Sequence, residues 1–69
     1  MDTSALDKLD LSDVYHVIST KLYGRPKFIM EAVLDGYSQD EIADEAGISR
    51  VTVGRDYKVA IETIKRELQ

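Results

Sequence analysis

Three basic side chains stand close together in the last third of the chain: Arg50, Arg55 and Lys58. The arginine fork can donate bidentately to guanine O6 and N7, or to a phosphate. A lysine suits a phosphate contact, because it neutralises a backbone charge without reading a base. Between the arginines, Val51 can contact a thymine methyl group and Thr52 can donate to a base edge. These residue types predict contacts to duplex DNA, provided that one helix presents them together.

Other residues extend this predicted interface. Gly54 has two interpretations: it allows the helix backbone to approach DNA closely, or it is a tolerated surface glycine that costs about 1 kcal/mol relative to alanine. Ser38 and Gln39 begin the preceding helix, and we expect them to lie near the DNA backbone, with Gln39 contacting a phosphate. Two more candidate phosphate contacts come earlier in the chain, at Arg25 and Lys27.

The chain offers little for catalysis or for a cofactor. It has no cysteine, and its single histidine, His16, has no nucleophile or acid at a recognisable spacing. No apolar run approaches the roughly 18–20 residues that span a bilayer, and no signal-peptide pattern is present. We therefore predict a cytoplasmic protein that is not an enzyme, with no catalytic residue, no cofactor and no membrane partner. A metal site is not predicted either, because the N-terminal aspartates lack the glycine and terminal glutamate of a calcium loop: Asp2, Asp7, Asp10 and Asp13.

Four helices are predicted to position the interface, and no strand pattern competes with them. The first covers about residues 11–23, and the second begins at Pro26 and ends at Gly36. The third begins at Ser38, and the fourth runs from Ser49 to about Leu68. With 69 residues there is room for one modest core. The sequence thus predicts a single compact all-α, four-helix domain over residues 1–69.

Helical periodicity also predicts which residues these helices bury. The expected inner residues, helix by helix, are Leu11, Val14, Tyr15, Ile18 and Leu22; Phe28, Ile29, Ala32 and Val33, with Met30 and Leu34 on a second face; Ile42, Ala43 and Ala46; and Val53, Tyr57, Ala60, Ile61, Ile64 and Leu68.

Residues 38–58 fit the pattern of a helix–turn–helix, with Gln39 as the first position of twenty. A small residue, Ala43, then falls where two helices cross closely, and Gly47 falls in the turn, where glycine avoids steric strain. Val53 falls where a branched apolar residue holds the second helix against the core. The pattern favours a DNA-binding helix–turn–helix with a long C-terminal recognition helix. The alternative is a helical hairpin that only packs.

The same stretch resembles a known family. Residues 35–43, DGYSQDEIA, followed by the run from Ala46 to Ser49 and by Thr52-Val53, are similar to the region 4 helix–turn–helix of bacterial sigma-70-type factors, and to the related domain of LuxR-type regulators. Region 2, the promoter-melting part of a sigma factor, is missing, so the resemblance implies a small sigma-like or phage-type transcription regulator. It also implies that certain residues face the major groove: Arg50, Val51, Thr52, Gly54 and Arg55.

The charge of the chain is unevenly distributed. The net charge is −4, but residues 1–49 hold four Lys or Arg against ten Asp or Glu, whereas residues 50–69 hold five against three. Four carboxylates lie on the third helix, and we interpret them as a solvated face: Asp40, Glu41, Asp44 and Glu45. The alternative is a site for a basic partner. Non-specific DNA affinity should be low in either case.

A single recognition helix reads only a few base pairs, so we predict a homodimer that pairs two half-sites. The first helix is the candidate dimer surface, because it has apolar residues that the predicted core does not use: Leu6, Leu9 and Val17. Two other functions remain open at this point. One is a protein-interaction module that acts on RNA polymerase or another regulator through the acidic face. The other is a phage DNA-packaging or recombination accessory protein.

Overall fold

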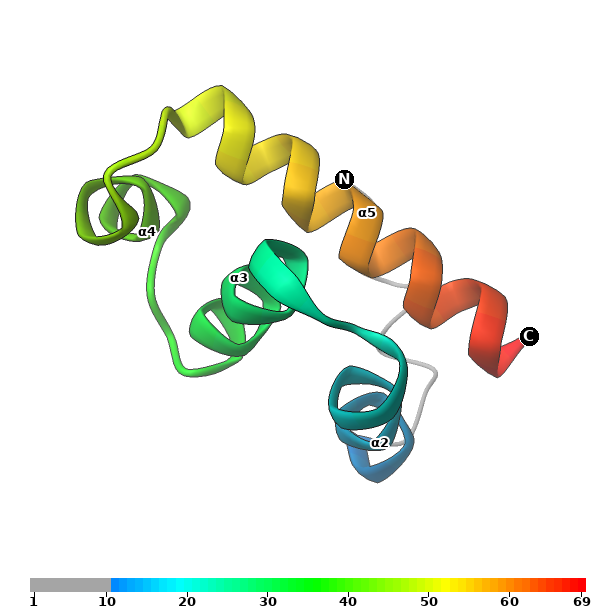
Figure 1. Ribbon diagram of the computed structural model, residues 1–69. Helices are drawn as coiled ribbons and strands as arrows, with labels where there is room; N and C mark the ends of the chain where they lie inside the picture. The colour runs from blue at the N-terminus through cyan, green and yellow to red at the C-terminus, as the bar shows by residue number, and fades with distance from the viewer. Residues whose placement is uncertain (1–10) are drawn as a thin grey trace.

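The computed structural model describes residues 11–69, and this part of the chain consists of four helices without a strand (Figure 1). The helices are α2 (Leu11–Lys21), α3 (Gly24–Leu34), α4 (Gln39–Ala46) and α5 (Arg50–Leu68). No helix in this range is both long enough and apolar enough to cross a membrane. The predicted all-α, four-helix class is therefore confirmed.

Helix α5 is the longest element, and it packs against each of the other three helices (Figure 1). Its N-terminal half lies beside α4, and its C-terminal half lies beside α2. Two clusters of buried side chains account for this arrangement, because each one holds a different half of α5.

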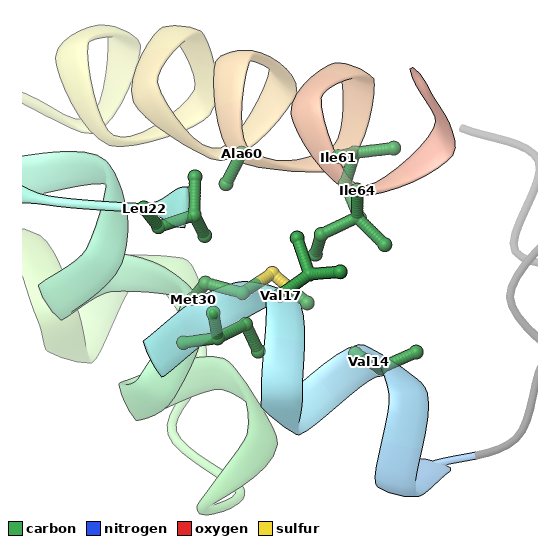
Figure 2. Close-up of a cluster of buried hydrophobic side chains, with 8 residues drawn as sticks. Val14, Val17, Leu22, Met30, Ala60, Ile61 and Ile64 are labelled. Carbon is green, nitrogen blue, oxygen red and sulfur yellow. The ribbon is translucent and has the colours of Figure 1, made fainter. Parts of the chain in front are cut away.

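The larger cluster joins α2 and α3 to the C-terminal half of α5. Figure 2 shows the side chains of α2 and α3 directed toward those of α5. Its buried members are Val14, Val17, Ile18, Leu22, Met30, Ala60, Ile61 and Ile64. Burial of this much apolar surface is the main force that fixes α2 on α5.

The smaller cluster consists of Ile29, Ile42 and Val53, one residue each from α3, α4 and α5. Tyr57 packs against both clusters, and its partial burial raises the pKa of its hydroxyl above the ordinary value for tyrosine. The neighbours Ile29 and Met30 thus serve different clusters, so α3 uses both of its predicted apolar faces. The predicted inner stripe of α5 is confirmed.

The prediction of which α2 residues face the core is partly wrong. Leu11 and Tyr15 are exposed, and Val17 is buried instead. The face of α2 that packs against α3 and α5 includes Val17, whereas Leu11 and Tyr15 lie outside this contact. Val17 therefore cannot contribute to a dimer surface. The other two residues proposed for that surface, Leu6 and Leu9, lie outside the described residues.

Helices α3 and α4 also differ from the prediction in detail. Helix α3 starts at Gly24, two residues before Pro26, and the proline still falls in the first turn, where its missing N–H costs nothing. Phe28 is exposed, because the buried faces of α3 are those of Ile29 and Met30. Ala46, the last residue of α4, is exposed as well.

Candidate nucleic-acid interface

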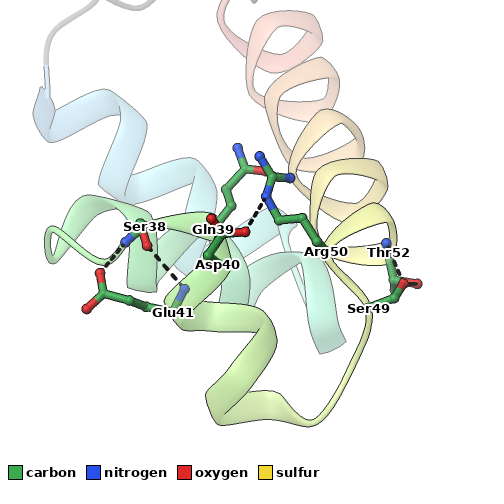
Figure 3. A network of polar contacts seen from close by, with 7 residues as sticks. All are labelled: Ser38, Gln39, Asp40, Glu41, Ser49, Arg50 and Thr52. Atoms are coloured by element: carbon green, nitrogen blue, oxygen red, sulfur yellow. Dashed lines mark hydrogen bonds and ion pairs between the residues drawn. The ribbon is translucent and has the colours of Figure 1, made fainter.

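Helix α4 begins with a capping box formed by Ser38 and Glu41, at the residue where the third helix was predicted to begin. The Ser38 hydroxyl accepts from the Glu41 N–H at 3.1 Å, and the Ser38 N–H donates to Glu41 Oε1 at 2.9 Å (Figure 3). This backbone donor, with the Ser38 side chain adding to it, lowers the pKa of the Glu41 carboxyl below its ordinary value. The Ser38 hydroxyl is therefore engaged within α4, where it fixes the first residue of the helix.

The turn between α4 and α5 has the expected geometry. Gly47 has a φ of 68°, in the left-handed region that favours glycine, and its N–H donates to the Ala43 carbonyl. The Ile48 N–H donates to the same carbonyl at 3.1 Å. Ser49 then caps α5 by accepting from the Thr52 N–H at 3.1 Å. The predicted helix–turn–helix is thus present, with both caps formed.

The packing inside the motif matches its sequence pattern. Ile42 and Val53 are buried, and the partly buried Ala43 and Ile48 pack against them. The small side chain at residue 43 lets the two helices approach each other, as the pattern requires. One consequence is that the first turns of α5 are held by α4, with their opposite side open to solvent.

Four of the six predicted contact residues on α5 are exposed. These residues are Arg50, Val51, Arg55 and Lys58, and 68% of the apolar Val51 is accessible to solvent. Thr52 is only partly exposed, and its hydroxyl shares a hydrogen bond with the Ser49 hydroxyl at 2.8 Å. The structure therefore exposes four predicted residues on α5, with Arg50 on the flank that faces the beginning of α4, and it sets Thr52 slightly back.

Arg50 is held by the beginning of α4. Its Nη1 donates to Gln39 Oε1 at 2.6 Å, and its Nε lies 3.2 Å from Asp40 Oδ1 (Figure 3). Two of the residues proposed for DNA contact, Arg50 and Gln39, therefore contact each other in the free chain. Asp40 is a partner that sequence reasoning missed, since no local spacing links it to Arg50.

Gly54 lies next to this contact. A Cβ atom at this position would stand 3.4 Å from Arg50 Nη1 and 3.6 Å from Gln39 Oε1, both ordinary van der Waals distances. The glycine is helical and has a normal φ. Neither local strain nor lack of space within the free chain therefore requires a glycine here.

A second ion pair links α3 to the middle of α5. The Arg25 guanidinium pairs with Asp56, which is only 8% exposed. Arg25 was predicted to be a phosphate contact, and the structure gives it an internal partner instead, while the similarly proposed Lys27 is partly buried on the same helix. A signal for Asp56 was present in the sequence. It follows Val53 by three residues and precedes Ala60 by four, so helical spacing places its carboxylate on the buried face.

No metal site competes with this interface among residues 11–69, where no three His, Cys, Asp or Glu residues group closely enough to hold an ion.

The chain was also compared with known proteins. A family model for ECF sigma factors matches residues 2–69. No curated protein and no solved structure gives a significant match. The match covers nearly the whole chain and agrees with the sigma region 4-like motif in residues 35–53.

Proposed function

The chain belongs to the ECF sigma factor family, and from this premise we propose that it binds duplex DNA sequence-specifically through α5 and thereby regulates transcription. The family implies an interaction with DNA and with RNA polymerase. The proposal adds which surface of this chain reads the DNA and which residues do so.

The observation that supports it best is the charge of the first turns of α5. Residues 50–58 contain a single acidic residue, Asp56, and that carboxylate is turned inward and neutralised by Arg25. The exposed residues of this segment include Arg55 and Lys58, which form no ion pair within the described part of the chain, and Arg50, which lies beside Asp40. A polyanion responds to the local field at the contact surface, so this segment can attract DNA although the whole chain is acidic.

Each exposed residue has a distinct role in the proposal. Arg55 makes no ion pair within the described part of the chain, so its fork is available to a base edge. Lys58, one turn further, contacts a phosphate, and Val51 contacts a thymine methyl. Arg50 is oriented by α4, so less of its side-chain freedom is lost on binding.

Four further contacts complete the proposed interface. Ser38 and Gln39 stand at the N-terminal end of α4, which in a helix–turn–helix lies near the DNA backbone. Thr52 and Gly54 are partly buried in the first turns of α5, where a close approach of DNA brings them within reach.

Selection of bound fragments from a random duplex pool tests this function. We expect a short motif to be enriched at low salt, because one recognition helix reads a few base pairs. No enrichment at any salt concentration, together with capture of an isolated RNA polymerase subunit, would instead favour the protein-interaction module. That second candidate is supported by the exposed carboxylates of Asp44 and Glu45 on α4.

Pairing of two copies is part of the same proposal, because it would supply a second half-site. Val17 takes no part, since it is buried in the core. Sedimentation analysis with and without the selected site measures this directly. If a single copy of the chain forms a specific complex with a DNA site that contains one half-site, then binding does not require a dimer.

A further inference from the structure

A pocket of about 410 Å³ lies between α3 and α4. It is lined by α3, by the connection from α3 to α4 and by α4 itself, and it includes no residue of α5. Figure 1 shows this connection as the green segment that joins the two helices. The pocket is therefore separate from the exposed residues of α5 proposed to contact DNA.

The inner part of this pocket is apolar and aromatic. Ile42 and Ala32 line it, and the rings of Phe28 and Tyr37 flank it. These rings are 47% and 52% exposed, respectively, which leaves much aromatic surface open to solvent. Exposed apolar surface gathered around a hollow is typical of an interaction site.

The remaining lining residues are all acidic: Glu31, Asp35 and Glu45. None of their carboxylates forms an ion pair or a side-chain hydrogen bond within the described part of the chain. No lysine or arginine lines the pocket. The site thus combines two aromatic faces with three unpaired negative charges.

The position of two of these carboxylates is unfavourable for the helix itself. Glu31 and Asp35 lie at the C-terminal end of α3, where the helix dipole favours positive charge. They are also four residues apart, a spacing at which like charges repel each other on a helix. Local stability therefore does not explain why both are acidic, whereas binding of a cationic partner does.

We propose that this pocket docks a basic segment of a partner protein by accepting an arginine side chain. The aliphatic stem packs on the partly exposed Ala32, above the buried Ile42, and the planar guanidinium stacks on Phe28 or Tyr37. The N–H fork then donates to the carboxylates at the rim. Arginine fits better than lysine, because its planar group both stacks on a ring and bonds two oxygens.

Charge complementarity distinguishes this occupant from others. Duplex DNA is repelled by the three carboxylates, and an uncharged apolar helix would cover them without pairing them. Because α5 does not line the pocket, a basic protein segment and DNA can be bound at the same time. The proposal does not depend on DNA binding by α5.

The test uses the whole chain and a fluorescein-labelled hexa-arginine peptide, with anisotropy as the measurement. The pocket variant carries Glu31→Gln and Asp35→Asn, and the matched control carries Glu62→Gln and Glu67→Gln, which remove the same charge from exposed positions on α5. We expect about a tenfold loss of affinity for the pocket variant and less than about a twofold loss for the control.

The aromatic part is tested separately. Phe28→Leu keeps an apolar side chain and removes the ring face, so hexa-arginine should bind several-fold more weakly, with a smaller effect on hexa-lysine. Tyr15→Leu is the control, because this exposed ring lies on α2, outside the pocket. Amide shifts of the unmodified chain on adding the peptide should centre on Phe28, Tyr37 and Ile42, which provides a readout that needs no variant.

Three results would overturn the proposal. Equal loss of binding by the pocket variant and its charge control would indicate diffuse attraction to an acidic chain. Equal binding of a hexa-citrulline peptide, which is nearly isosteric but neutral, would indicate an apolar occupant. Self-association of the chain that disappears in the pocket variant would assign the pocket to a second copy.

Discussion

Gly54 lies in the interior of α5, where alanine would favour the helix by about 1 kcal/mol. A methyl group there would meet only the Arg50 and Gln39 side chains, at ordinary contact distances. The free chain therefore gains nothing evident from this glycine. Both interpretations from the sequence therefore stay open: a close approach of DNA to the helix backbone, or a tolerated surface glycine.

Replacing Gly54 separates these effects. We expect Gly54→Ala to raise the free energy of unfolding by about 1 kcal/mol in urea titrations, because it restores helix propensity. If DNA approaches the backbone here, affinity for the selected site should fall in the same variant. A destabilised variant would show that the contact between Arg50 and Gln39 cannot accommodate a methyl group.

Asp56 depends on Arg25, because its carboxylate is nearly buried, whereas the Arg25 side chain is 54% exposed. Arg25→Ala leaves this carboxylate without its partner and should lower the free energy of unfolding by about 1–3 kcal/mol. Lys27→Ala, in the same turn of α3, should have a smaller effect. If the two substitutions lowered the free energy of unfolding equally, the ion pair between Arg25 and Asp56 would not be a specific source of stability.

The carboxylate of Glu41 makes the free energy of unfolding depend on pH. Its folded-state pKa is lowered by the Ser38 N–H, so its contribution is complete above the ordinary pKa of a glutamate and is lost as pH falls through the lowered value. Glu41→Gln keeps a hydrogen-bond acceptor but does not titrate. Urea midpoints measured between neutral and acidic pH should fall less in Glu41→Gln than in the unmodified chain. Parallel curves would contradict this account.

Among the helices, α4 and α5 were predicted well because their boundaries depend on local chemistry. The capping box at Ser38 and the turn at Gly47 involve residues at most five positions apart. The buried face of α2 depends instead on where α3 and α5 lie, so Tyr15 and Val17 were assigned to the wrong sides. The ion pair between Arg25 and Asp56 spans 31 positions, and only the folded chain brings its two members together.

The turn of the helix–turn–helix gives a test at this scale. Gly47→Val places a β-branched residue at a positive φ and should lower the free energy of unfolding by about 1–3 kcal/mol. Gly47→Asn is the control, since asparagine tolerates the left-handed region, and it should cost less. Thermal unfolding followed by circular dichroism measures both. A valine variant as stable as the asparagine variant would argue against the geometry of this turn.

Considered as a whole, the molecule separates its charges. The exposed side of residues 50–58 is basic, and the pocket between α3 and α4 is acidic. Few phosphates can be neutralised by so few cations, so binding to random duplex should be weak and its dependence on salt shallow. Sequence preference must then come from base contacts rather than from overall attraction.

The most direct test of this account compares Arg55→Ala, Lys58→Ala and Lys65→Ala on the selected site and on a scrambled duplex, over a range of salt concentrations. Arg55→Ala should cost about 1–3 kcal/mol on the selected site and relax the choice of base there. Lys58→Ala should weaken both duplexes alike and reduce the salt slope by about 1. Lys65→Ala, near the end of α5, should change little. Equal weakening by all three, with no change in sequence preference, would contradict readout by α5.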